Sequence, residues 1–201
     1  REINKMNVSV DDIKKLRELT GVGLTDAREA LKEADGDFEK ALEAMRKKGL
    51  TRAEKRAERE TCAGVIDSYV HDGRIGVLVE VNCETDFVAR TEEFKALAHE
   101  IALQIAAMNP IYLSLEDVPA EEMERVKAEA LASDDLAGKP ADIAEKIVAG
   151  RIEKYFAEKT LLKQAYIKEE SKTVEAVVKD AIAKLGENIT IKRFTRIEMG
   201  L

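Results

Sequence analysis

The chain has 201 residues, of which 45% are hydrophobic, 36% charged and 4% aromatic, and its formal net charge is −7. This length fits one domain, or one domain with a small module, and leaves room for a core that needs neither disulfides nor metal. The acidic balance argues against a nucleic-acid coat, two cysteines exclude a disulfide framework, and the composition favours helices over an all-β fold.

The first residues, REINKMNVSVDD, lack an apolar core, and no apolar run reaches the ~18 residues that a membrane-spanning helix needs. We therefore expect no secretory signal here, no membrane partner and a cytoplasmic location. Cys62 and Cys83 are then expected to be reduced thiols.

Three short helices are predicted over residues 9–48, because apolar residues recur there at helical spacing after residues suited to N-caps. Gly21 and Gly49 are expected to end the first and third helices. The predicted inward residues are Val10, Ile13, Leu16 and Leu19, then Ala27, Ala30, Leu31 and Ala34, then Phe38, Ala41, Leu42 and Met45. A three-helix bundle over residues 8–50 follows, a common form of docking module.

A basic linker is predicted over residues 51–62. Residues 46–59 hold seven Lys or Arg and two Glu, a local net charge of +5. A solvated helical connector is the favoured interpretation, because aromatic side chains are absent. A basic patch for an acidic partner or RNA is the alternative.

After the linker, apolar residues recur at every second position instead of at helical spacing. Residues 63–70 and 74–83 predict antiparallel strands joined by the turn His71-Asp72-Gly73. A third strand is predicted near the end of the chain, where four apolar residues share one parity and Phe194 has the other, so a bulge or burial on both faces is expected. The four are Ile189, Ile191, Ile197 and Met199.

Helices are predicted between the second and third strands. One runs from Thr91 to Pro110, residues 119–158 form an antiparallel hairpin with a polar loop at 133–139, and the last covers residues 173–185. Strands, then helices, then a returning strand make residues 63–201 an α+β core.

No catalytic constellation is visible. Cys62, His71, Cys83 and His99 match no compact zinc spacing, and Gly21 and Gly23 lack the later glycine and lysine of a phosphate loop. We expect no metal, no cofactor and no enzymatic activity.

One segment, NCETDFVAR at residues 82–90, stands out. Thr85 or Asp86 can cap a helical turn there. Phe87 can fold onto the core, which residue types alone favour, or stand beside the acid as an apolar probe.

Several motifs are similar to those of the elongation factor Ts family, in the same order along the chain. They are EVNCETDFVAR at 80–90, LRELTGVGLTD at 16–26, GKP with IAEKI at 138–147, and GENI at 186–189. The resemblance covers residues 8–201 and implies an N-terminal domain like a ubiquitin-associated domain, a small antiparallel sheet with helices, and a protruding hairpin. It is closest to the short type, which implies a homodimer that binds two molecules of elongation factor Tu.

The resemblance also implies guanine nucleotide exchange on elongation factor Tu, a GTPase, by displacement of Mg²⁺ and disturbance of the phosphate site. Asp86 and Phe87 would insert into the partner, with Thr85 and Val88 holding the turn. Three residues match contacts of the N-terminal domain with the partner's nucleotide domain: Arg17, Leu24 and Thr25. A plain scaffold that binds a partner without releasing nucleotide, and an RNA-binding module, remain competing hypotheses.

Overall fold

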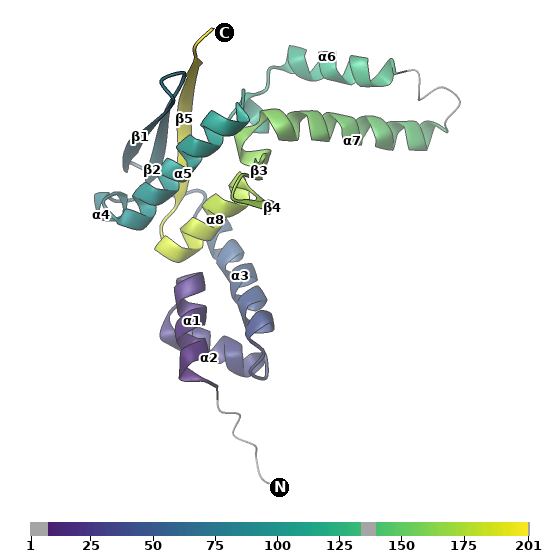
Figure 1. The fold of residues 1–201 in the computed structure, drawn as a ribbon. Coiled ribbons are helices and arrows are strands. Elements are labelled where there is room, and N and C mark those ends of the chain that lie inside the picture. The colour runs from purple at the N-terminus through teal and green to yellow at the C-terminus, as the bar shows by residue number, and fades with distance from the viewer. Residues whose placement is uncertain (1–7, 134–139, 201) are drawn as a thin grey trace. The chain divides into compact units, whose positions relative to one another are not determined.

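The computed structural model describes residues 8–133 and 140–200, so the predicted loop at 133–139 lies almost entirely outside the described residues (Figure 1). The fold is α+β, as predicted. Among the described residues, no helix has both the length and the apolar character required to cross a bilayer. The chain divides into two compact units: Arg1–Asp67, Glu80–Ala98 and Ala176–Lys192 make unit 1, and Ser68–Val79, His99–Glu175 and Arg193–Leu201 make unit 2.

A three-stranded sheet in the order β1-β2-β5 contributes to both units. Its strands are β1 (Ala63–His71), β2 (Ile75–Cys83) and β5 (Ile189–Glu198). The predicted turn joins β1 to β2, and Asp72 and Gly73 have φ values of 49° and 67°. Two successive positive φ values are the signature of the hairpin turn whose twist matches the flanking strands.

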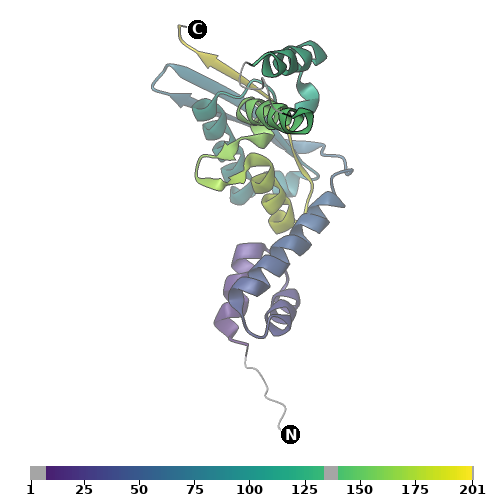
Figure 2. The ribbon, with the colours of Figure 1, turned by 90° about the vertical axis from the view of Figure 1, so that its right-hand side faces the viewer.

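Helix α5 (Glu92–Met108) lies along one face of this sheet (Figures 1 and 2). The Thr91 hydroxyl accepts a hydrogen bond from the Phe94 N–H at 3.3 Å, which confirms Thr91 as its cap. Facing residues of β2 are buried at every second position, as the alternation predicts: Val77, Val79, Val81 and Cys83. The buried apolar residues of α5 are Phe94, Leu97 and Ala98 in unit 1 and Ile101, Ala102, Ile105 and Ala106 in unit 2.

The N-terminal bundle of unit 1 contains α1 (Val10–Thr20), α2 (Leu24–Glu33) and α3 (Phe38–Glu54). The prediction for the face of α1 is half wrong. Ile13 and Leu16 are buried, but Val10 and Leu19 are 65% and 61% exposed. Each threefold step turns a helix by about 60° short of a full circle, so four such residues spread over about half the helix circumference. One narrow bundle core can cover only the middle pair.

The predicted end of α3 at Gly49 is also wrong, because the helix continues to Glu54. Gly49 is buried, and a Cβ built there would lie 3.0 Å from the Cβ of Ala183. Ala183 belongs to α8 (Val174–Leu185), which also lies in unit 1 at this point. The glycine therefore permits close approach of two helices rather than ending one.

Two glycines provide a test of backbone packing, because replacing each by alanine should change the free energy of unfolding in opposite directions. Gly64 in β1 has φ 158°, and an added Cβ would lie 2.3 Å from the Val81 carbonyl oxygen. We expect Gly64→Ala to destabilise the protein by about 1–3 kcal/mol. Gly150 in α7 meets nothing within 4 Å, so Gly150→Ala should stabilise by about 0.5–1 kcal/mol. Thermal unfolding followed by circular dichroism measures both, and equal shifts would contradict the account.

Unit 2 contains the predicted helical hairpin, formed by α6 (Ala120–Leu131) and α7 (Ala141–Lys159). The two helices lie side by side in Figure 1. The Arg125 guanidinium on α6 donates to Glu122 at 2.7 Å and to the Tyr155 hydroxyl of α7 at 3.2 Å. The Tyr155 hydroxyl donates in turn to the Glu122 carboxylate at 3.0 Å, so Tyr155 joins α7 to α6.

The inner face of β5 changes parity partway along the strand. Ile189 and Ile191 are buried as predicted. Ile197 and Met199 are 69% and 64% exposed, so the prediction that all four residues lie on one buried face is wrong for these two. Lys192 and Arg193 are both exposed, which places the change there. Arg196 takes the inner position instead, and its guanidinium donates to the Ala106 carbonyl at 3.3 Å. The alternative of burial on both faces is wrong for this part of β5, because no residue from Lys192 to Glu198 is buried, and the bulge remains a prediction.

A second sheet of two short strands was not predicted: β3 (Ala165–Tyr166) and β4 (Glu169–Thr173). β4 reads EESKT and has no apolar alternation, so it carried no strand signal.

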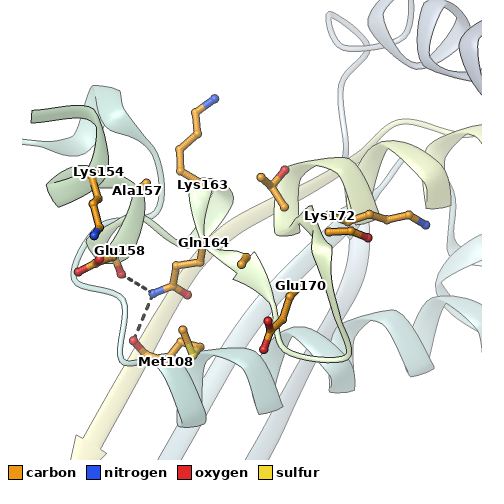
Figure 3. A pocket seen from close by; sticks show the side chains of 11 residues that line it. Met108, Lys154, Ala157, Glu158, Lys163, Gln164, Glu170 and Lys172 are labelled. Atoms are coloured by element: carbon orange, nitrogen blue, oxygen red, sulfur yellow. Dashed lines mark hydrogen bonds between the residues drawn. The ribbon is translucent and has the colours of Figure 1, made fainter. Parts of the chain in front are cut away.

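A shallow pocket of about 320 Å³ lies beside this small sheet (Figure 3). In it the buried Gln164 amide donates to the Met108 carbonyl at 3.2 Å and the Glu158 carbonyl at 2.8 Å. Both are helix C-terminal carbonyls, from α5 and α7, which have no partner within their helices. Gln164 thus ties together the ends of two helices, and the pocket's most enclosed polar group already has structural partners.

Candidate functional site

The segment singled out by sequence forms one turn of helix between β2 and α5. This turn, α4 (Asp86–Ala89), begins at Thr85, whose hydroxyl accepts from the Val88 N–H at 3.5 Å. The N-cap role predicted for Thr85 is therefore confirmed. Buried Ala89 and partly buried Val88 anchor the far end of the turn. We call residues 85–88 the TDFV turn.

Phe87 projects into solvent. Its side chain is 79% exposed, the highest value among the exposed large hydrophobic residues of the described chain. Asp86 is beside it, and the Asp86 carboxylate pairs with the Arg90 guanidinium at 2.8 Å on the surface. The core interpretation of Phe87 is therefore wrong, and the turn displays a ring next to an acid. Exposing a benzyl ring costs solvation free energy that a partner surface would recover.

Residues more than a hundred positions away hold the base of this turn. The Glu187 carboxylate accepts from the Thr85 N–H at 3.0 Å and from the Thr85 hydroxyl at 2.6 Å. In the opposite direction, the Asn188 N–H donates to the Glu84 carboxylate at 2.7 Å. No residue pattern predicts a role for Glu187, whose one sequence signal is its place in the GENI motif.

Cys83 supports the turn from the core side. Its buried thiol donates to the Thr85 carbonyl at 3.1 Å. Burial, and then the negative charge of Glu187, raises the pKa of the Cys83 thiol. The thiol therefore keeps the proton that it donates. Cys83 is a core residue, as predicted, with this additional hydrogen bond.

Glu84 provides a pH test of the base of the turn. The hydrogen bond from the Asn188 N–H, with Arg59 nearby, lowers the pKa of Glu84 below its ordinary value of 4.5. A lowered folded-state pKa stabilises the fold above the unfolded-state pKa, and this contribution is lost as pH falls through the folded-state value. We expect Glu84→Gln to lower the melting temperature at pH 7, with a deficit that shrinks below about pH 4.5.

Melting curves at pH 7 and pH 3.5 measure this difference. Glu170→Gln, at an exposed position of β4, is the matched control for loss of a carboxylate and should show no comparable change with pH. A deficit of equal size at both pH values would contradict the role assigned to the Glu84 carboxylate.

The predicted contact residues of the bundle are all on its surface. Arg17, Leu24 and Thr25 are exposed, and Leu24 is 57% exposed. Leu19, predicted to face inward, is exposed at the same α1–α2 connection and enlarges its apolar surface.

The other candidate sites have structural partners. Among the described residues, no group of three or more His, Cys, Asp or Glu is placed to hold a metal ion. In the basic stretch, Lys47 pairs with Glu43, Lys48 with Asp26, and Arg59 with Glu84. The Arg56 guanidinium donates to the Ile182 carbonyl. These intramolecular contacts favour the connector interpretation over an RNA patch.

An exposed ring and carboxylate on a turn held by distant residues, in an α+β fold that begins with a helical bundle, are typical of a protein that acts by contact with a partner. The comparisons agree with this class. A family model described as "Elongation factor TS" matches residues 11–201. Elongation factor Ts of Thermotoga petrophila is 55% identical over 97% of this chain and 98% of the relative. The proteins of the same name from Thermotoga maritima and Syntrophomonas wolfei are 54% and 52% identical, over 97% and 96% of this chain and 98% and 91% of the relatives.

The chain belongs to the elongation factor Ts family, a family of protein-synthesis factors. The resemblance inferred from the sequence motifs is confirmed.

Proposed function

We propose that this protein binds elongation factor Tu in its GDP form and promotes release of the nucleotide, so that GTP can load. Family membership supports the role, and the exposure of Phe87 on a braced turn is the observation that carries it. Exchange needs no covalent step, so the protein acts as a binding factor rather than an enzyme and needs no cofactor.

The TDFV turn is the proposed exchange element. A GTPase holds GDP largely through phosphate contacts and Mg²⁺. Phe87 would insert between side chains of the partner's nucleotide domain, and Asp86 would compete for a cation or hydrogen-bond donors there. Thr85 and Val88 hold the turn. The resulting displacement of Mg²⁺ leaves the phosphate charge less compensated and weakens GDP binding.

Thermodynamic linkage limits what such a factor can do. It must bind nucleotide-free elongation factor Tu more tightly than the GDP form, because a ligand shifts an equilibrium only by its differential affinity. It needs no preference for GTP over GDP.

The N-terminal bundle is the proposed second contact. Arg17, Leu24 and Thr25 would meet the partner's nucleotide domain, with exposed Leu19 extending the apolar part of this surface. The division into a bundle at 8–50, a linker at 51–62 and a core at 63–201 is part of this proposal. The cytoplasm, where protein synthesis occurs, is the proposed location.

A homodimer is the proposed functional form, giving two copies of this chain and two of elongation factor Tu. Its support is the outer face of the sheet in unit 2. Four large apolar side chains are more than half exposed there: Val70 of β1, Leu78 of β2, Ile197 of β5 and Met199 just after β5. An isologous contact between two such faces would bury all of them.

Release of labelled GDP from elongation factor Tu tests the proposal directly. Catalytic amounts of this protein should accelerate release severalfold or more. Unchanged release, with complex formation intact, would favour the scaffold hypothesis instead. Salt-sensitive RNA binding that is lost when residues 46–59 are neutralised would favour the RNA-binding hypothesis.

A further inference from the structure

Three groups form hydrogen bonds with Thr85 at the start of the TDFV turn: the Cys83 thiol, the Val88 N–H and the Glu187 carboxylate. Of these three, Glu187 is the one that is distant in sequence, and it forms two hydrogen bonds with Thr85. The Cys83 thiol and the Val88 N–H come from the same local segment. The Glu187 carboxylate comes from the GENI segment, between α8 and β5. Its two oxygens accept the backbone N–H and the hydroxyl of a single residue, Thr85.

This bidentate contact fixes both the position and the rotamer of Thr85. The N–H of an N-cap residue and its side chain are otherwise free to turn toward water. Because the Thr85 hydroxyl directs its proton at Glu187, the lone pairs of the Thr85 hydroxyl oxygen remain available to accept from the Val88 N–H. Glu187 thus orients the cap that starts the helical turn carrying Phe87.

The backbone that presents Glu187 is itself specified. Gly186 has φ 80°, a left-handed conformation that ends α8, and its N–H donates to the Ile182 carbonyl at 3.0 Å. The next residue but one, buried Asn188, donates through its amide to the Ala57 and Arg59 carbonyls. Glu187 is therefore held between a helix end and a buried anchor.

We propose that Glu187 is a positioning residue for nucleotide exchange, acting through Thr85 to hold the TDFV turn ready for insertion. The inference rests on the proposed exchange function. A turn that is already ordered loses less conformational entropy when Phe87 enters the partner, so the bound state reaches the exchange-competent geometry more often. Glu187 itself is 102 residues from Thr85, and both of its hydrogen bonds to the turn are to Thr85.

The first test uses the free protein. The chain contains no tryptophan, so Phe87→Trp introduces a single fluorescent reporter at the tip of the turn. Glu187→Gln places an amide donor against one of the two Thr85 donors while preserving side-chain size. Adding it to Phe87→Trp should lower the steady-state anisotropy of the tryptophan with an unchanged far-ultraviolet circular dichroism spectrum. Glu170→Gln, the matched control, should leave the anisotropy unchanged.

The second test measures GDP release at increasing concentrations of factor with Phe87 intact. We expect Glu187→Gln to lower the plateau rate by roughly threefold to tenfold and to change the half-saturating concentration little. A loss of folded protein would raise the half-saturating concentration and leave the plateau in place. In a Thr85→Val background, Glu187→Gln should have a smaller effect, because one of its two contacts is already gone.

The two tests separate the possible failures. Unchanged anisotropy, or a plateau equal to that of Glu170→Gln, would overturn the positioning role. Full additivity with Thr85→Val would overturn the route through Thr85. If wild-type protein releases no GDP, the proposed function is wrong, and the anisotropy alone then decides whether Glu187 immobilises the turn.

Discussion

Phe87→Ala is expected to reduce stimulated GDP release by roughly tenfold to thirtyfold at a fixed, subsaturating concentration of factor. Phe87 is 79% exposed in the free protein, so most of its apolar surface is available for burial in the partner. Truncating a central aromatic residue at an interface typically costs about 2 kcal/mol or more, which corresponds to about thirtyfold.

Stability distinguishes this explanation from a core role. Because Phe87 is exposed, its removal should change the free energy of unfolding by no more than about 0.5 kcal/mol. Leu115→Ala, at another exposed apolar position, is the control and should release GDP like the wild type. If Phe87→Ala stimulates GDP release as fast as the wild type does, the ring has no role in exchange. A large loss of stability would instead show that the ring packs on the core.

Ile197→Asp is expected to weaken self-association by roughly a hundredfold or more, because a buried, unpaired carboxylate costs several kcal/mol. Two-fold symmetry places the substitution in the interface twice. Ile197 is 69% exposed in the single chain, so the fold should remain intact. Sedimentation equilibrium should show a change from twice the chain mass to once that mass.

Ile143→Asp makes the same chemical change at an exposed position of α7 and should leave the dimer intact. A wild-type protein that sediments as a monomer, or an Ile197→Asp variant that remains a dimer, would show that the apolar sheet face has another role.

Local patterns determined most of the secondary structure of this chain. Period-two alternation located β2, and cap chemistry located Thr85 and Thr91. These signals are readable because a side chain bonding to a backbone group three residues away needs no tertiary partner. The same reasoning explains why the short polar β4 was missed: its pairing depends on β3 rather than on its own composition.

Helix faces and strand faces were less predictable. The apolar residues of α1 seemed equivalent in sequence, but the bundle covers Ile13 and Leu16 and leaves Leu19 exposed. In β5, Ile197 follows the parity of Ile191, yet the change near Lys192 turns it outward. Which face is buried depends on what packs against an element, and no local pattern contains that information.

The sequence by itself identified the family and the TDFV motif, because both depend on residue identity and order. Only the tertiary structure decided that Phe87 faces solvent and that the Glu187 carboxylate accepts two hydrogen bonds from Thr85. Both are properties of the folded chain. The exposure of a side chain depends on what packs around it, and the contact between residues 102 positions apart forms only because the chain brings the segment after α8 next to the segment after β2.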